Sequence, residues 1–289
     1  MRPSLGKALI IGVLVLLTGC STVRLGYESG PTVAWWWLDG YVDFSSEQAP
    51  KAKDLIRQWF AWHRPSQLPE FAALLASAQA PLAEATTPAQ VCRWVERSRA
   101  VAEASIDRAL TMGADLVPGL GEAQFKHLEQ RYAKSLAEMR NDYLQPRPEE
   151  RLKASIKRAS ERAESIYGRL DDTQRKLVAA GIAASPFDPE AWLQERQRRQ
   201  ADIVQTLRRL VAERADRDSI VAALRAQAER IERSPDPAYR SYQQRLTEFN
   251  CGLGAQLHNS TSAEQRKQAQ AKLKGWEDDL RALNAAPAS

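Results

Sequence analysis

The sequence has few of the residues on which enzymes and metal proteins most often depend. Its 289 residues include three cysteines and three histidines. They form no CxxC pair, HExxH helix, GxSxG elbow, P-loop or GxGxxG turn, and no pair of the ExxH motifs that a di-iron bundle requires. Adjacent carboxylates such as Asp171 and Asp172 point apart on a helix and do not form an acid–base pair. We therefore expect a protein that is not an enzyme and that has no catalytic residues, metal or cofactor.

Signals for β-structure are also missing. No segment alternates strictly between apolar and polar residues over a strand's length, and no hairpin signal joins two such segments. Apolar residues instead recur every three or four positions, as in Leu55, Ile56, Trp59 and His63. With 44% hydrophobic and 27% charged residues, the composition excludes wholesale disorder and a polytopic membrane protein. The pattern predicts an all-α fold, an irregular bundle of roughly nine to eleven amphipathic helices.

The N-terminus carries a sorting signal. Residues 1–19 begin with two cations and continue with an apolar run, Ala8 to Leu17, that is too short to span a bilayer comfortably. The following Leu17-Thr18-Gly19-Cys20 resembles the lipobox of bacterial lipoproteins, although an ordinary signal peptide beside a chance cysteine would read similarly. The resemblance implies cleavage before Cys20 and acylation of that residue. It also implies an outer-membrane lipoprotein facing the periplasm, because Ser21 rather than Asp follows the cysteine.

Export of the chain bears on the domain layout and on the remaining thiols. We expect a single helical domain over 20–289, with a subdivision near 183–190 as an alternative. Cys92 and Cys251 are then the thiols left in an oxidising compartment, which favours a disulfide between them. Two buried, reduced thiols remain the alternative at this stage.

Charge gives only a weak indication of partners. The formal net charge is +5, and it becomes +3 if Arg2 and Lys7 leave with the signal peptide. Arginines gather in Glu195-Arg196-Gln197-Arg198-Arg199 and again in Arg208-Arg209. This cluster is either a solvated helix face, balanced by neighbouring carboxylates, or a surface for anionic lipid or a periplasmic protein. The periplasm excludes nucleic acid as an ordinary partner.

Five segments repeat a helix-start pattern in which a cap-type residue precedes a glutamine by three positions. The caps are Ser45, Thr87, Gly121, Asp171 and Ser262. The spacing is that of a capping box, in which the glutamine reaches back to the N–H of the cap residue. It is also similar to the L-T-x-x-Q motif of periplasmic chaperones of the Spy and CpxP kind. No copy here has the full Leu-Thr pair, and capping alone accounts for the spacing.

The first fifth of the mature chain carries a more specific resemblance. Its residues are Val23-Arg24-Leu25-Gly26-Tyr27, Trp36-Trp37-Leu38-Asp39-Gly40-Tyr41-Val42-Asp43 and Trp62-His63-Arg64-Pro65-Ser66-Gln67-Leu68-Pro69. They resemble an uncharacterised bacterial lipoprotein family, domain of unknown function six-two-seven-nine. The resemblance implies a lipid-anchored helical envelope protein and supplies no activity.

The best local candidate for a recognition corner is formed by Trp62, His63, Arg64 and Gln67. His63 continues an apolar stripe and so faces the core, whereas Arg64 is expected at a helix end that Pro65 terminates. A buried, hydrogen-bonded histidine at a helix–helix corner explains the motif. A surface that binds a carboxylate or a lipid phosphate through Arg64 is the functional alternative.

Tryptophan is concentrated near the N-terminus. Trp35, Trp36, Trp37, Trp59 and Trp62 are five of the eight tryptophans in the chain. A core helix that packs against the next helical stripe is the hypothesis that we favour for the triple tryptophan. The alternative is a position at the membrane interface, close to the lipid anchor.

The sequence thus predicts a lipid-anchored, non-catalytic interaction module, either a scaffold or a holdase-like protein, tethered to the membrane through Cys20. Two other functions stay open, an envelope enzyme with an active site near His63 and a structural accessory of an outer-membrane complex. A cleft with His63 beside a carboxylate would favour the enzyme, and a flat apolar patch would favour the accessory. A concave basic and apolar surface would favour the interaction module.

Overall fold

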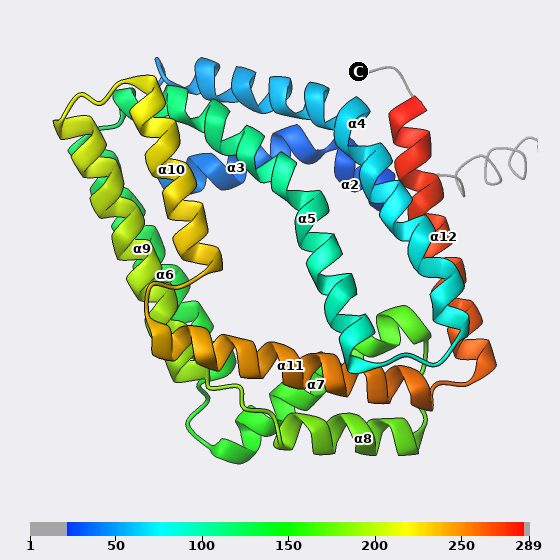
Figure 1. Ribbon diagram of the computed structural model, residues 1–289. Helices are drawn as coiled ribbons and strands as arrows, with labels where there is room; N and C mark the ends of the chain where they lie inside the picture. Colours follow the sequence, from blue (N-terminus) through cyan, green and yellow to red (C-terminus); the bar gives the residue numbers. More distant parts are fainter. Residues whose placement is uncertain (1–21, 286–289) are drawn as a thin grey trace, which may run out of the picture.

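The computed structural model describes residues 22–285, and its regular elements over this range are all helical. Cys20 and the predicted signal peptide lie outside the described residues. Eleven α-helices, α2 to α12, occur in this range (Figure 1). They are α2 (Thr22–Glu28), α3 (Gly30–Val42), α4 (Ala49–Gln79), α5 (Pro88–Gly113), α6 (Glu122–Tyr143), α7 (Pro148–Tyr167), α8 (Asp172–Ala183), α9 (Pro189–Ala212), α10 (Arg217–Glu232), α11 (Pro237–Ser260) and α12 (Ala263–Ala285). The predicted all-α fold is confirmed.

The helices are arranged along the four sides of a rough quadrilateral in Figure 1. Helix α4 runs along the top and down the right-hand side, where it pairs with α12. Helices α6 and α9 pair at the left, and α11 lies along the bottom, in contact with α5 and α8. These pairings join segments that are distant in sequence. Helix α9 returns to α6, and the last two helices, α11 and α12, return to α5 and α4.

Apolar burial is divided among small clusters at the helix contacts. One cluster joins Ala114 and Val117 to buried residues of α9 and α10, and a second joins Phe125 and Leu128 of α6 to Val204 of α9. A third unites α7, the loop after it and α8. Each side chain of these clusters is removed from water by two or three helices, which fixes their relative positions.

All five predicted helix-start patterns form the expected hydrogen bonds. Thr87 and Asp171 make complete capping boxes with Gln90 and Gln174. The backbone N–H groups of Ser45, Gly121 and Ser262 each donate to the glutamine three residues ahead. The turn at Ser45 precedes the first residue of α4, Ala49, by four positions.

The prediction that Pro65 ends a helix is wrong. Helix α4 continues through Pro65 and Pro69 to Gln79. Each proline lacks an N–H and crowds the preceding turn, which bends a helix without necessarily ending it. Figure 1 shows α4 changing direction along its length, and packing against α3, α5 and α12 keeps both parts in place. The expected corner is therefore a bend within one continuous helix.

Candidate functional site

The predicted recognition corner lies inside the bundle. His63, Arg64 and Gln67 are all buried on α4, and the ring of Trp62 is half-buried. Arg64 is therefore an interior residue of a bent helix and not the helix-end residue that the sequence predicts. Its guanidinium lies over the ring of Tyr27, 5.8 Å from the centroid.

His63 is held in a neutral, aromatic environment. The residue is 7% exposed, and its ring stacks on that of Trp59, with 4.4 Å between the ring centroids. The hydroxyl of Tyr27 lies 3.0 Å from Nδ1 of His63. Burial lowers the pKa of His63 from 6.5 to about 4, and burial raises the pKa of Tyr27 to about 12 although Arg64 opposes that rise. Neither group carries charge at neutral pH, so this contact supports the fold and gives no sign of acid–base chemistry.

Four of the five arginines of α9 are paired with carboxylates, and Arg196 is the exception among the described residues. Arg198 and Arg199 both donate to Glu195, at 2.7 and 2.8 Å. Burial raises the pKa of Glu195, but the hydrogen bonds from these arginines outweigh it and hold the pKa at about 2. Farther along the helix, Arg208 bonds to Glu122 and Glu129 of α6.

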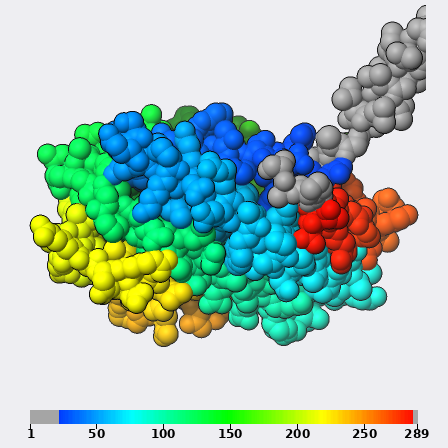
Figure 2. Space-filling view, turned by 90° about the horizontal axis from the view of Figure 1, so that it is seen from above, coloured from blue at the N-terminus to red at the C-terminus, as the bar shows by residue number. Residues whose placement is uncertain are grey.

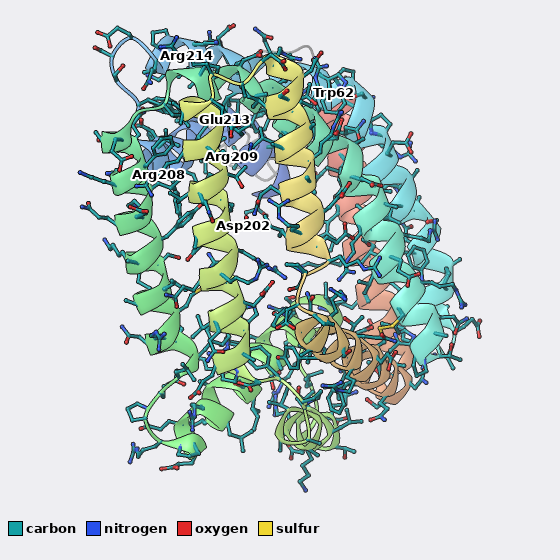
Figure 3. The ribbon with its side chains drawn as sticks, turned by 60° about the vertical axis from the view of Figure 1, so that its left-hand side comes forward. Trp62, Asp202, Arg208, Arg209, Glu213 and Arg214 are labelled. Carbon is teal, nitrogen blue, oxygen red and sulfur yellow. A yellow bond between two sulfur atoms is a disulfide. The ribbon has the colours of Figure 1, made fainter. Side chains whose placement is uncertain are left out.

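Figure 3 shows Asp202, Arg208, Arg209 and Glu213 spaced along α9. Arg209 pairs with Glu213 at 3.0 Å, and Asp202 accepts from Arg230 of α10 at 2.9 Å. This cluster therefore behaves as a balanced helix face that also ties α9 to its neighbours. It does not present a large uncompensated positive charge.

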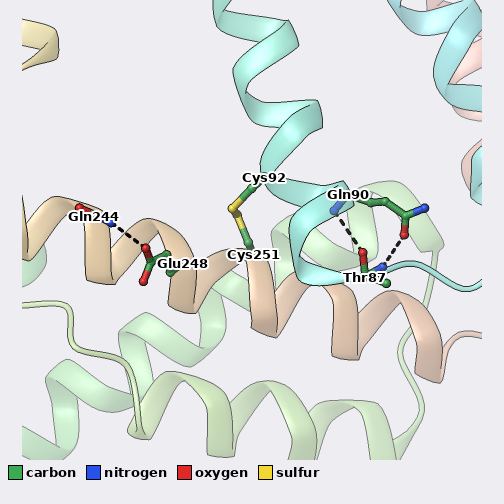
Figure 4. The surroundings of a disulfide bond; sticks show 6 residues. All are labelled: Thr87, Gln90, Cys92, Gln244, Glu248 and Cys251. Carbon is green, nitrogen blue, oxygen red and sulfur yellow. Dashed lines mark hydrogen bonds between the residues drawn. A yellow bond between two sulfur atoms is a disulfide. The ribbon is translucent and has the colours of Figure 1, made fainter.

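Cys92 of α5 and Cys251 of α11 form a disulfide, with their Cα atoms 5.5 Å apart (Figure 4). The bond joins the start of α5 to the middle of α11 across 159 residues of sequence. Nearby, Thr86 and Asn259 exchange two hydrogen bonds between the same two segments. The junction of α5 and α11 is thus fixed both covalently and by polar contacts.

The triple tryptophan is not a core element as a whole, which corrects the favoured hypothesis. Trp36 and Trp37 are 68% and 63% exposed, and α3 has no buried residue. Only Trp35 turns inward, where it stacks on Phe44. The cause is geometric, because three consecutive residues of a helix cover more than half of its circumference and cannot all face one neighbour.

A groove of about 640 Å³ opens beside α7. We call it the α7 groove. Helix α7 forms one wall, the segment that joins α8 to α9 forms the other, and α11 contributes to the floor. Its lining residues are Tyr143, Leu144, Arg151, Leu152, Ser155, Arg158, Ala159, Arg162, Ile182, Ser185, Phe187, Asp188, Pro189, Glu190, Leu246 and Asn250.

Three arginines line the α7 wall of this groove at positions i, i+7 and i+11, which lie on one side of a helix. Arg158 packs over Tyr143 at 4.4 Å and donates to the backbone oxygen of Asp142 at 3.0 Å. Arg151 and Arg162 have no ion pair or side-chain hydrogen bond with another residue that the structure describes. The wall therefore presents two uncompensated positive charges beside apolar side chains.

The opposite wall carries negative charge. Asp188 caps α9 by accepting from the N–H groups of Glu190 and Ala191, and Glu190 itself is exposed. Phe187 of the same wall packs against Tyr143 at the end of α6, with 6.2 Å between the ring centroids. The α7 groove is thus lined by apolar side chains, by arginines of α7 and by the acidic residues Asp188 and Glu190.

Sequence reasoning missed this groove, although a signal exists. Arg151, Arg158 and Arg162 share one helix face with Leu152 and Ala159, but no local motif marks the segment as a wall. The other lining residues come from the end of α6, from α8, α9 and α11, and from the segments after α6 and α8, so only the fold brings the groove together.

The sequence also missed a second role of the capping glutamines. Gln174 and Gln265 donate to each other's side-chain oxygens at 2.7 and 2.9 Å. Each also donates to a backbone oxygen before the other's helix, that of Ser260 or Arg169, at 3.0 Å. Gln48 and Gln124 pair in the same way at the starts of α4 and α6. Two pairs of helix starts are therefore locked together by reciprocal amide contacts.

The fold and its surfaces define an all-helical protein with a groove that is lined by charged and apolar side chains. No three His, Cys, Asp or Glu side chains in this range are grouped so as to hold a metal ion. The chain belongs to a family described as Family of unknown function (DUF6279), whose model matches residues 40–217, more than half of the sequence. No curated protein and no solved structure matches it.

Proposed function

We propose that this protein is a lipid-anchored, non-catalytic binding module of the bacterial cell envelope. Its α7 groove would hold an amphipathic, acidic segment of a periplasmic partner protein. The observation that carries the proposal is the pair of unpartnered guanidinium groups of Arg151 and Arg162 beside an apolar floor. Arginine forks bind carboxylates in a bidentate manner, and apolar residues between charged walls supply the contact area.

The two walls favour a polypeptide over an anionic lipid. A phosphate headgroup would meet the α7 wall favourably but would also face Asp188 and Glu190. A helical or extended protein segment can place acidic residues toward α7 and basic residues toward the other wall. Opposite charges on the two sides would thus fix both the orientation and the register of the bound segment.

Two observations support a place in the envelope. The lipobox at Leu17–Cys20 offers an acylation site, and several acyl chains give a stable tether. A disulfide between Cys92 and Cys251 is suited to an oxidising compartment such as the periplasm. Within residues 22–285 no helix is long and apolar enough to cross a bilayer. Anchoring in the outer membrane, rather than the inner one, rests on Ser21 after the lipobox cysteine.

The anchor is tested by replacing Cys20. Cells that express the unaltered chain should incorporate radioactive palmitate into a shortened mature protein. Cys20→Ser should give an unlabelled precursor of full length. Palmitate labelling of this variant, or its maturation to the same size, would contradict the anchor.

The groove is tested by fluorescence anisotropy with two labelled amphipathic peptides. One peptide has glutamates opposite a leucine face, and its counterpart has lysines in the same positions. We expect the glutamate peptide to bind at least tenfold more tightly. Arg151→Glu/Arg162→Glu should remove that preference.

A matched control keeps the same change in net charge. Arg93→Glu/Arg233→Glu replaces two exposed arginines outside the groove. This variant should bind the glutamate peptide as the unaltered protein does. Equal weakening by both double variants would show a general charge effect and would refute a specific site in the α7 groove.

A further inference from the structure

Helices α2 and α3 expose an apolar surface that no described residue covers. Its members are Leu25, Val33, Trp36 and Trp37, with exposed fractions between 49% and 68%. We call this surface the tryptophan face. Soluble proteins rarely expose several large apolar residues together, and such a patch usually marks a contact site for a protein or a membrane.

Three of the four members of the tryptophan face lie on one side of α3. Val33, Trp36, Trp37 and Gly40 stand at i, i+3, i+4 and i+7, the spacing of a single helical stripe, and all four are exposed. The stripe contains no charged residue. A helix face that is exposed to water usually carries charged residues at such positions. This stripe is therefore better suited to contact with an apolar surface than to water.

Contacts on the other sides of α3 prevent the tryptophans from turning inward. Tyr41 packs against Tyr132 of α6 at 5.7 Å, and the oxygen of Gly40 lies 3.2 Å from Nε2 of His127. Trp35 stacks on Phe44 and has the ammonium group of Lys53 over its ring at 4.6 Å. Because α3 is held by both α4 and α6, its third side stays at the surface.

The position of the face in the chain limits what can cover it. Helix α2 begins at Thr22, two residues after the proposed acylation site at Cys20, and two residues extend at most about 7 Å. Helices α2 and α3 have 7 and 13 residues, so they are about 10 and about 20 Å long. Figure 2 shows these N-terminal residues in dark blue at the molecular surface. A tether at Cys20 would therefore keep the whole face within about 40 Å of the bilayer.

We propose that the tryptophan face of α3 lies on the lipid bilayer, with Trp36 and Trp37 in the headgroup region. This inference rests on the proposed lipid anchor but does not depend on the α7 groove. Indole rings favour the interface because one part is apolar and the N–H can bond to water or headgroups. Contact at the face would add a second attachment to the acyl chains and would fix the orientation of the bundle on the membrane.

Quenching by brominated lipid measures this contact directly. The full chain is purified from bacterial membranes and placed in vesicles of phosphatidylethanolamine and phosphatidylglycerol, with or without bromine on the acyl chains. We expect brominated lipid to quench the tryptophan emission. Trp36→Phe/Trp37→Phe should abolish the quenching, which is at most about one quarter of the signal because two of eight tryptophans contribute.

Trp94→Phe is the control, because its ring lies on α5 beneath Arg97, at 4.4 Å. It should leave the quenched amount unchanged. Equal fractional quenching of the unaltered chain and Trp36→Phe/Trp37→Phe would overturn the proposal. A dimer in sedimentation that Trp36→Ser/Trp37→Ser disperses, without lipid quenching, would assign the face to a second copy and would overturn it as well.

Palmitate labelling of the same preparation separates this inference from the proposed anchor. Labelling without quenching of Trp36 and Trp37 would refute the face and leave the anchor in place. Quenching without labelling would refute the anchor and uphold the face.

Discussion

The hydroxyl of Tyr27 lies 3.0 Å from Nδ1 of His63, and this contact joins α2 to the bend of α4. It brings together two of the segments that resemble a known family, Val23–Tyr27 and Trp62–Pro69, which are 36 residues apart at the contact. Trp59 stacks on the imidazole, with 4.4 Å between the ring centroids. The arrangement explains why Tyr27 and His63 occur together. Their rings pack against one another, and each supplies a hydrogen-bond partner for the other's polar group.

Removing either buried residue of the bend should destabilise the protein. His63→Ala deletes a packed ring and leaves the Tyr27 hydroxyl without its partner, which should cost about 2–4 kcal/mol. Arg64→Ala should cost about 2 kcal/mol, more than the few tenths typical of an exposed helix end, because Arg64 is buried. Urea unfolding of the two variants measures both values. Unchanged midpoints would show that the bend does not depend on these side chains.

Burial of the neutral imidazole predicts a specific pH dependence. Because the pKa of His63 is about 4 in the folded protein and 6.5 ordinarily, the unfolded chain binds the proton more strongly. The contribution of neutral His63 to the free energy of unfolding is fully present above about pH 6.5. As the pH falls toward 4, the free energy of unfolding decreases by about 2–4 kcal/mol. His63→Phe should flatten this part of the stability curve, whereas His127→Gln should not. A curve for His63→Phe that falls as steeply as that of the unaltered protein would contradict the assignment.

The disulfide should contribute strongly to stability because it closes a long loop. A separation of 159 residues corresponds to about 4–5 kcal/mol in the chain-entropy account. Cys92→Ala/Cys251→Ala should lower the free energy of unfolding accordingly. Thiol titration of exported Cys20→Ser protein, unfolded without reductant, should detect no free thiol. Two titrating thiols would show that the bond does not form in the cell.

The paired glutamines should matter more than those that only cap a helix. Gln174 is 1% exposed and bonds to both Gln265 and the backbone of Ser260. Gln174→Ala should cost about 2–3 kcal/mol because it removes a buried side chain and leaves the half-buried amide of Gln265 without its partner. Gln90→Ala is the matched control, since Gln90 serves the capping box of α5, and it should cost about 0.5–1 kcal/mol. Equal costs would mean that the pairing between helices adds nothing to capping.

Local patterns predict the local parts of this structure. Period-3.6 stripes and cap–glutamine spacing predict the helices and their starts, because both depend on residues within one or two turns. Pro65 misleads because a proline bends a helix whose flanks are held by other elements, here α12 and α5. Trp36 and Trp37 mislead because apolar character predicts burial, whereas no element within residues 22–285 covers their side of α3.

The α7 groove shows the limit of sequence reasoning more clearly. Its charge comes from Arg151 and Arg162, but its shape comes from residues up to 99 positions away, such as Asn250. A search for dense arginine runs instead selects the segment around Arg198 in α9, where Glu195 and Asp202 neutralise the charge. Arg151 and Arg162 are fewer, but they are unpaired and therefore available to bind a partner. Whether an arginine is paired depends on the fold and cannot be read from the sequence alone.

Site-specific photocrosslinking in intact cells tests the central claim most directly. A photoreactive residue replaces Leu152, which lines the α7 groove, or Ile106, another exposed apolar residue, which lies on α5 outside the groove. We predict that the Leu152 position crosslinks a discrete partner through an acidic, apolar segment identified by mass spectrometry, and that Arg151→Glu/Arg162→Glu abolishes the product. The same products from both positions, or products that persist in the arginine variant, would contradict a binding module that works through the α7 groove.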